Sequence, residues 1–416
     1  MPRKFTAYFA ATFAAALFAL IFAATASAAE KPKTLHDFAV KGNDGSTVYS
    51  TLTLDAAGNL YGTTVDGGRY NSGIVFELSP TQSGLWNETI LYNFKGGGGD
   101  GANPHSAPVF DSAGNLYGST VGGGLNAKLC NSGCGVVYKL APSGNGAWTE
   151  TILHEFTGGT DGGVAYAGVV LDGAGNIYGA NEIGGTSGNG VFYELSATSG
   201  SWQEVVFHNF GGKPDVADAY ATPAFDAGNI YGTSYGGGAH GQGAVYELSQ
   251  SNGSWTEQVL YSFKGGNDGA EPFAPVIFDQ AGNIYGTTAE GGTESVGTAF
   301  ELLVAQGWKK VILHQFLGLE SGDGANPNGL VFDAKGNLYG TTVGGGTDNP
   351  GTIFKLTPTS HGWKETILYN FTGGNDGAYP SASPTLDSAG NLFGTTLWGG
   401  PAGDTVGGVA FELALQ

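Results

Sequence analysis

The phrase DSAGNLYGST, residues 111–120, reads as a β-hairpin in which an Asp and a Gly-Asn turn precede a short strand. Asp accepts hydrogen bonds from turn amides, Gly adopts a positive φ without strain, and Asn tolerates the same conformation. Closely related phrases occur seven times, beginning at Asp55, Asp111, Asp172, Asp226, Asp279, Asp333 and Asp387. Such regular recurrence indicates a repeat architecture.

The repeat has a period of about 54 residues. The aromatic residue of the phrase falls at Tyr61, Tyr117, Tyr178, Tyr231, Tyr285, Tyr339 and Phe393, in steps of 56, 61, 53, 54, 54 and 54 residues. Only the second step is much longer, and it contains both cysteines of the chain. The sequence therefore predicts seven copies of one structural unit, with one insertion.

Each unit contains four strand-like segments, which in the sixth copy are residues 329–333, 338–342, 352–356 and 363–371. The last segment alternates polar and apolar residues, which is the period-2 pattern of a strand with two unlike faces. Short turns join the four segments, so each unit is expected to be an antiparallel meander. A single meander cannot bury both of its faces, and neighbouring units must therefore stack.

The ends of the chain predict a closed ring. The third strand of the unit occurs seven times, whereas the Trp-led fourth strand occurs only six times. Residues 33–38, KTLHDF, match the second half of that fourth strand and so supply the missing piece. Closure removes the exposed edge strands of an open stack. We predict an all-β, seven-bladed β-propeller whose N-terminal strand joins the last blade, in preference to an open solenoid.

Composition agrees with an all-β fold and limits the partners. Gly contributes 75 of 416 residues and aromatics 12%, which favours short strands and many tight turns. The formal net charge is −20, and Arg69 is the only arginine after residue 3. A nucleic-acid-binding surface needs clustered Lys and Arg. We therefore expect no nucleic-acid partner, and we expect a monomer.

The N-terminus has the layout of a secretory signal peptide. Arg3 and Lys4 precede an uncharged, Ala- and Phe-rich run, and residues 26–28 are Ala-Ser-Ala. We expect cleavage after Ala28, a single propeller domain over residues 29–416, and a secreted or periplasmic protein. An uncleaved anchor is the alternative, because the apolar run approaches the ~20 residues that span a bilayer. No other membrane segment is expected.

The two cysteines, Cys130 and Cys134, lie in the sequence LCNSGCG. In an exported protein, two cysteines this close are expected to form a disulfide that closes a small loop. A metal site is the alternative, but two thiolates without a third Cys or a nearby His make only half a zinc site.

The unit resembles the GloVer tandem repeat of bacterial secreted and surface proteins. The matching elements are the AGN-[LI]-YGTT phrase, the Gly-rich loop after it, the VFEL strand and the Trp-led ETILYNF strand, which together cover residues 33–416. Members of that family often carry a C-terminal anchor, whereas this sequence ends within a strand, so we expect a released or periplasmic protein. More distantly, the phrase is similar to NHL-type repeats, which are mostly binding scaffolds. The resemblance implies location and architecture, but no chemistry.

Acidic and imidazole side chains recur in the unit and are interpreted as structural. A second Asp lies in each connection between units, at Asp44, Asp100, Asp161, Asp215, Asp268, Asp323 and Asp376. A calcium loop needs several oxygen ligands at alternating positions, so both Asp series are expected to stabilise turns, with cation sites at some of them as the alternative. Four histidines, His36, His154, His208 and His314, share a position with three tyrosines, Tyr92, Tyr261 and Tyr369. This interchange favours a packing position over a metal ligand.

Candidate binding residues lie five positions after the second Asp, close to the start of each innermost strand. This series is Tyr49, His105, Tyr166, Tyr220 and Phe273, and it lapses at Pro327 or Asn328 and at Ser381. Flat rings on one side of the channel mouth would stack on sugar faces or clamp a peptide. Packing between blades is the alternative explanation of the same residues.

These features favour a non-enzymatic binding protein whose ligand, a glycan or a protein, lies on the face of the Gly-rich loops. No catalytic residue, metal ligand or cofactor is assigned. The alternative is an extracellular hydrolase or lyase acting on carbohydrate, which requires two carboxylates ~5–9.5 Å apart in one cleft. A purely structural component of the cell envelope is a third possibility.

Overall fold

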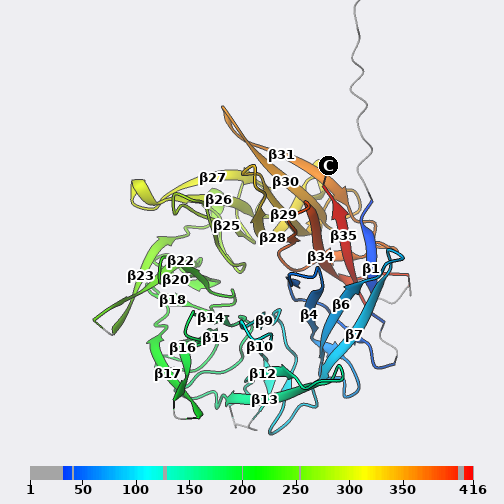
Figure 1. Cartoon of the computed structure of the whole chain (residues 1–416). Helices are drawn as coiled ribbons and strands as arrows, with labels where there is room; N and C mark the ends of the chain where they lie inside the picture. The colour runs from blue at the N-terminus through cyan, green and yellow to red at the C-terminus, as the bar shows by residue number, and fades with distance from the viewer. Residues whose placement is uncertain are drawn as a thin grey trace, which may run out of the picture.

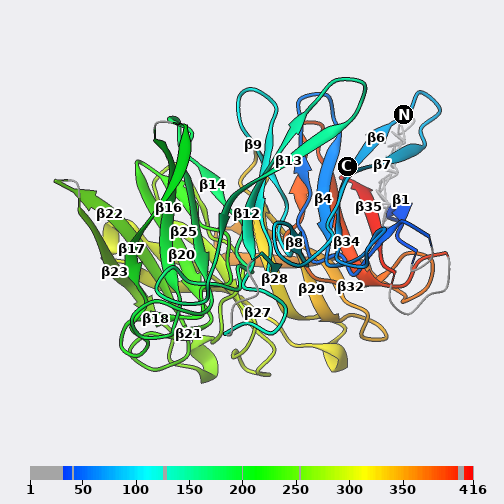
Figure 2. The ribbon, with the colours of Figure 1, turned by 90° about the horizontal axis from the view of Figure 1, so that it is seen from below.

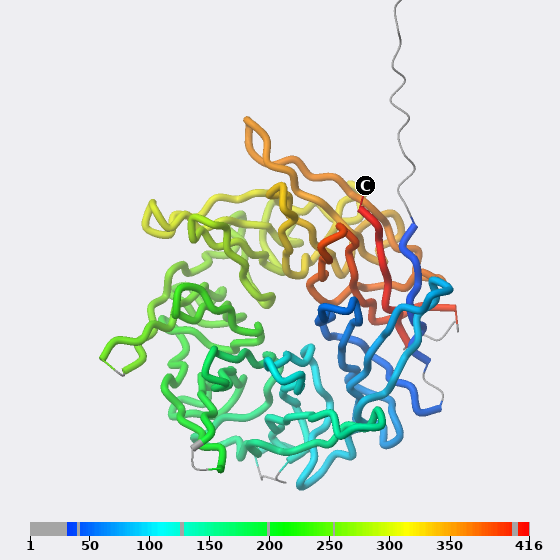
Figure 3. Tube along the Cα trace, viewed as in Figure 1, coloured from blue at the N-terminus to red at the C-terminus, as the bar shows by residue number. Residues whose placement is uncertain are grey.

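The protein is a ring of seven antiparallel, four-stranded sheets around a central channel (Figure 1, Figure 3). The computed structural model describes residues 31–39, 42–124, 129–198, 200–252, 254–401 and 407–415. Within these residues the helices are three single 3-10 turns, η1 (Gly266–Asp268), η2 (Val304–Gln306) and η3 (Leu319–Ser321). The predicted seven-bladed β-propeller is confirmed.

In each of the first four blades, the strands follow one another from the channel outwards. They are blade 1 with β3 (Thr53–Leu54), β4 (Leu60–Thr64), β6 (Ile74–Pro80) and β7 (Trp86–Asn93), blade 2 with β9 (Val109–Phe110), β10 (Leu116–Ser119), β12 (Val136–Pro142) and β13 (Trp148–Glu155), blade 3 with β14 (Val170–Leu171), β15 (Ile177–Asn181), β16 (Val191–Thr198) and β17 (Ser201–Asn209), and blade 4 with β19 (Ala224–Asp226), β20 (Asn229–Ser234), β22 (Ala244–Ser251) and β23 (Ser254–Ser262).

The remaining three blades follow the same order. They are blade 5 with β24 (Ile277–Phe278), β25 (Ile284–Thr288), β26 (Thr298–Leu303) and β27 (Lys309–Gln315), blade 6 with β28 (Gly324–Phe332), β29 (Leu338–Gly345), β30 (Thr352–Thr359) and β31 (Gly362–Asn370), and blade 7 with β33 (Thr385–Leu386), β34 (Asn391–Trp398), β35 (Val409–Ala414) and β1 (Lys33–Asp37). Short pairs outside the blades are β2 (Gly45–Ser46) with β5 (Asp66–Gly67), β8 (Gly101–Ala102) with β11 (Gly122–Gly123), and β18 (Val216–Ala217) with β21 (Gly236–Gly237), while β32 (Ala378–Pro380) pairs with β34.

The N-terminal strand closes the ring, as predicted. β1 pairs antiparallel with β35 as the outermost strand of blade 7, with Thr34 opposite Phe411 and His36 opposite Ala410. The same outer pairing occurs inside blade 1, where β7 pairs with β6. Blade 7 therefore combines the two ends of the described chain, and no blade is left with three strands.

The two faces of the ring carry different connections (Figure 2). The turns between the first and second strands and between the third and fourth strands of the blades, including those after β9 and β6, extend on one face. Short strands such as β18 and β21 lie toward the other face, which also carries the connections between blades. This second face is the one on which the sequence placed the candidate binding residues.

The Gly of the repeated phrase makes room for an aromatic ring from the neighbouring strand of the same blade. In blade 5, a Cβ atom added at Gly286 would lie 2.7 Å from Cζ of Phe300, the aromatic residue of the third strand. An aromatic ring occupies this place in every blade, at Phe76, Tyr138, Tyr193, Tyr246, Phe300, Phe354 and Phe411. All seven rings are buried. These rings form the centre of each blade's core.

The first hydroxyl residue after this Gly joins neighbouring blades. Thr63 Oγ1 donates a hydrogen bond to Ser106 O in the next blade (3.0 Å), and Thr395 Oγ1 of blade 7 donates to Ser50 O at blade 1 (3.0 Å). Four further blades make the same bond, from Ser119, Thr233, Thr287 and Thr341. Blade 3 has Ala180 at this position, and there the backbone N–H of Gly168 donates a hydrogen bond to Thr222 Oγ1 (2.9 Å) instead.

The predicted turn role of the first Asp is visible in the structure. Asp172 Oδ1 accepts hydrogen bonds from the amides of Ala174 and Asn176, while Oδ2 accepts from Asn176 Nδ2 and from the Tyr178 hydroxyl. The same turn occurs at Asp55, Asp111, Asp279, Asp333 and, without the tyrosine, Asp387. A conserved arrangement of donors around one carboxylate explains why the phrase recurs.

The predicted signal peptide, residues 1–28, lies outside the described residues. In the part of the chain that the structure describes, no helix has the length and apolar character needed to cross a bilayer. The predicted disulfide is confirmed, because Cys130 and Cys134 are bonded to each other. This disulfide packs in the core between blades 2 and 3, with Cys134 fully buried.

Candidate ligand-binding site at the channel mouth

The connections between blades share a constrained backbone that directs the chain toward the channel. The third residue after the second Asp has a left-handed φ between 53° and 62° in every blade, at Thr47, Asn103, Val164, Asp218, Glu271, Asn326 and Tyr379. Residues other than Gly seldom adopt this conformation, which costs about 1–2 kcal/mol. Its presence in all seven connections shows that the fold imposes it. The candidate residue follows two positions later.

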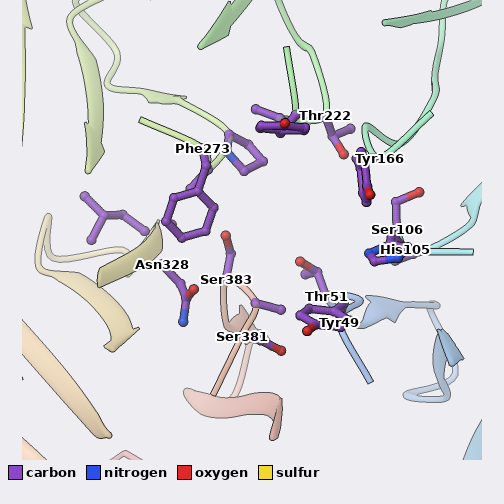
Figure 4. A pocket seen from close by; sticks show the side chains of 18 of the residues that line it. Tyr49, Thr51, His105, Ser106, Tyr166, Thr222, Phe273, Asn328, Ser381 and Ser383 are labelled. Atoms are coloured by element: carbon purple, nitrogen blue, oxygen red, sulfur yellow. The ribbon is translucent and has the colours of Figure 1, made fainter. Parts of the chain in front are cut away.

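All five predicted binding residues line one cavity at the channel mouth (Figure 4). The cavity has a volume of about 670 Å³, within the ~300–1,000 Å³ typical of small-ligand sites. Tyr49 is 40% exposed, and the other four predicted residues, His105, Tyr166, Tyr220 and Phe273, are partly buried.

Four of these rings form a continuous arc along the cavity wall. Tyr49 stacks on His105, with ring centres 5.1 Å apart. The rings of His105 and Tyr166 make a T-shaped contact, with centres 4.8 Å apart. Tyr166 then contacts Tyr220 at 5.3 Å, which in turn contacts Tyr235 at 5.6 Å. These contacts cross from blade to blade, so part of each ring packs against its neighbours. The side chains of Tyr49, His105 and Tyr166 border the cavity (Figure 4), and Tyr220 is also among its lining residues.

Polar side chains complete the ring where the aromatic series lapses. Asn328 and Ser381 both line the cavity, together with Ser383 (Figure 4). Asn328 Nδ2 donates to Thr341 Oγ1 (3.0 Å) and to Pro380 O (2.8 Å), and Ser381 Oγ donates to Val48 O (3.0 Å). The mouth is therefore aromatic at blades 1 to 5 and polar at blades 6 and 7.

The cavity wall carries no formal charge at neutral pH. Among the described residues that line it there is no Asp, Glu, Lys or Arg. His105 is the only imidazole among them, and burial lowers its pKa to about 4, so its ring is neutral. The acid pair that a glycoside hydrolase requires is thus not found among the described lining residues.

Two residues next to the arc were not identified by the sequence analysis. Glu182 follows the second strand of blade 3, where blades 1, 2 and 6 have Val, and its Oε1 accepts a hydrogen bond from the Tyr220 hydroxyl (2.7 Å). Burial, followed by this bond to Glu182, raises the pKa of Tyr220. Tyr235 occupies the equivalent position of blade 4 and extends the arc. The sequence signal for both residues is that they differ from the residues at the same position in other repeats.

The histidines that were interpreted as packing residues do contact aromatic rings, but they also face carboxylates. His154 lies edge-on to Phe156 at 4.8 Å, while its Nε2 atom is 3.6 Å from Asp161 and 3.7 Å from Glu204 of the next blade. We call each such group of three a junction cluster, because it lies between two blades. The part of the chain that the structure describes contains four junction clusters, which are His36–Asp44–Glu88, His154–Asp161–Glu204, His208–Asp215–Glu257 and His314–Asp323–Glu365.

The second Asp also has the turn role expected for it. Asp215 accepts hydrogen bonds from the amides of Gly211 (2.6 Å) and Val216 (2.7 Å), and Asp323 accepts from Leu317 (2.9 Å) and Gly324 (2.6 Å). These backbone hydrogen bonds therefore hold the Asp carboxylates in position independently of any contact with His.

Comparison with known proteins identifies the family. Residues 19–218 and 167–411 match the Gloeobacter/Verrucomicrobia repeat, and the chain belongs to this family. The predicted resemblance is thereby confirmed. No curated protein matches the chain.

Solved structures show the same architecture at low sequence identity. One is a proposed 6-phosphogluconolactonase from Bacteroides uniformis, which aligns with a TM-score of 0.53 and 13% identity over 82% of this chain and 88% of that one. At this identity the likeness concerns the fold alone.

Proposed function

We propose that this propeller is an exported binding protein that holds a neutral carbohydrate in the cavity at the channel mouth. The observation that carries the proposal is the arc of Tyr49, His105, Tyr166 and Tyr220, whose rings contact one another in sequence and line one side of that cavity. Aromatic faces bind the apolar C–H faces of sugar rings with little loss of conformational entropy.

The opposite wall supports the same ligand class. A sugar presents hydroxyl groups at its edge as well as apolar faces, and the polar side of the cavity offers Asn328, Ser381 and Ser383. Pockets that combine apolar surface with a few convergent polar groups are typical of small-ligand sites. A flat aromatic wall facing a polar wall therefore suits one or two sugar residues.

Charge supports a neutral ligand over an anionic one. The chain has a formal net charge of −20, and no cationic side chain lies among the described lining residues. An acidic glycan would be repelled by the surrounding field and would find no counter-charge in the cavity. Export is supported by the signal-peptide pattern of residues 1–28 and by the Cys130–Cys134 disulfide, since disulfides persist mainly in oxidising compartments.

A glycan array probed with the purified protein tests the proposal, followed by titration calorimetry with the best neutral hit. The double variant Tyr166→Ala/Tyr220→Ala should weaken binding at least about tenfold, a loss of about 1.4 kcal/mol. Tyr166→Phe should retain most of the affinity, because stacking needs the ring and not the hydroxyl.

Tyr70→Ala is the matched control, since Tyr70 is 45% exposed and lies outside the residues that line the cavity. Its affinity should equal that of the wild-type protein. Undiminished binding in the Tyr166→Ala/Tyr220→Ala variant would contradict the proposed site. Capture of a protein and of no glycan would replace the carbohydrate with a protein partner.

A further inference from the structure

The junction clusters bring one imidazole and two carboxylates together at four separate places in the ring. Each cluster combines the His of one outer strand, the Asp of the connection and the Glu of the next blade's outer strand. The three ligand atoms lie within 4.8 Å of one another. From His Nε2 to the two carboxylates the distances are 3.0–3.8 Å over all four clusters.

This spacing matches the ligand set of a small divalent ion. Zinc binds His nitrogen and carboxylate oxygen at ~2.0–2.2 Å, so two ligands of a tetrahedral site lie roughly 3.3 Å apart. In the His314 cluster, Nε2 is 3.0 Å from Asp323 and 3.4 Å from Glu365. An ion would therefore enter with small movements of the side chains, and a water molecule would complete its coordination.

The glutamates leave bonding capacity unused inside the fold. The Glu257 side chain is only 8% exposed, and its Oε1 atom is buried without a hydrogen-bond partner while Oε2 lies 3.0 Å from His208 Nε2. Oε1 is likewise buried and unpartnered in Glu88, Glu204 and Glu365. A buried carboxylate without full compensation is costly.

Another junction contains the positive charge that the four junction clusters lack. Between blades 4 and 5 the Glu is replaced by Lys310, whose Nζ atom is 2.8 Å from Asp268 Oδ1 and whose side chain is 5% exposed. The protein thus supplies a fixed cation at this junction, and here the His position is Tyr261. Among the described junctions, a His occurs only where both carboxylates are present and no buried Lys pairs with the Asp.

We propose that the four junction clusters bind divalent transition-metal ions of the zinc class. Each offers one imidazole nitrogen and two carboxylate oxygens, and a divalent cation balances the two negative charges of the carboxylates. This ligand set suits zinc or a similar first-row ion, whereas calcium takes six to eight oxygen ligands. The ions would connect adjacent blades and would lie away from the channel-mouth cavity.

The repeat itself provides conservative variants for the test. Tyr occupies the His position in three junctions, so His208→Tyr uses a residue that the fold already accepts there. Conversely, Tyr92 faces an intact carboxylate pair, with its hydroxyl 3.0 Å from Asp100 Oδ2 and 2.6 Å from Glu150 Oε2. Tyr92→His should therefore create a fifth site, and Tyr261→His should create none because Lys310 fills that junction.

The experiment is titration of the purified, EDTA-stripped protein with zinc, with the bound metal counted by mass spectrometry after dialysis. We expect four zinc ions in the wild-type protein, three in His208→Tyr, five in Tyr92→His and four in Tyr261→His. Zinc should raise the melting temperature of the wild-type protein, and calcium should not. Absence of zinc binding, or the same number of ions in all four proteins, would overturn the proposal.

Discussion

At the scale of single residues, Gly286 shows why the repeated phrase contains a Gly beside its aromatic residue. The backbone there is not in the left-handed region, so conformational freedom is not the reason. A Cβ atom at this position would lie 2.7 Å from Cζ of the Phe300 ring, closer than real contacts allow. The requirement is room for an aromatic ring over the Gly, and it recurs in each blade.

We predict that Gly286→Ala destabilises the protein by about 1–3 kcal/mol, the usual cost of overpacking a well-packed core. Gly173→Ala is the control, because a Cβ atom at Gly173 would meet nothing within 4 Å. That variant should unfold at the wild-type denaturant concentration or slightly above it. Chemical denaturation measures both, and equal stability of the two variants would contradict the packing explanation.

At the scale of elements, the Asp-centred turn was predictable because all of its partners lie within six residues of the carboxylate. Asp226 is the exception that the sequence also signals, since one residue is missing there. Ala227 and Gly228 then form a tighter turn with φ values of 49° and 87°, and Asn229 bonds to Glu247 instead. Local chemistry is therefore readable when donors and acceptor are close in sequence.

These turns should make the free energy of unfolding depend on pH. Partial burial alone would raise the pKa of Asp172, but the hydrogen bonds of the turn, led by the Asn176 amide, hold it below its ordinary value. The pKa values of Asp55, Asp111, Asp279 and Asp333 are lowered in the same way. A lowered pKa stabilises the fold above the unfolded value of ~3.9, and that contribution is lost as the pH falls through the folded value.

We therefore predict that the unfolding free energy falls as the pH is lowered below about 4. Asp172→Asn should be less stable at neutral pH and should lose less on acidification, because the variant side chain does not titrate. Asp348→Asn, at an exposed loop position, should follow the wild-type curve. Urea titrations at several pH values measure this, and parallel curves for Asp172→Asn and the wild type would refute it.

At the scale of the whole molecule, the closed ring could be predicted by counting the strands of the repeat. Seven third strands and six Trp-led fourth strands left one place, and residues 33–38 carried the matching pattern. β1 does pair with β35. Regular spacing also placed the five aromatic candidates at one mouth, because equivalent positions of a ring must lie around its axis.

Contacts between blades could not be predicted from the sequence. In the junction clusters, the Glu lies about 50 residues after its His, and only the curvature of the ring brings the two together. The bond from Tyr220 to Glu182 has the same origin, since its partners belong to adjacent blades. A one-dimensional reading detects a residue that breaks the repeat, but it does not show which neighbour that residue meets.

The central claim is that the aromatic arc holds a sugar at the channel mouth. A crystal structure of the protein soaked with the best neutral glycan from the array tests this most directly. We predict density for a sugar ring within the cavity, with its apolar face against Tyr166 or Tyr220 and its hydroxyl groups toward Asn328 and Ser383. A sugar bound on the outer surface of the blades, with the cavity filled only by water, would contradict it.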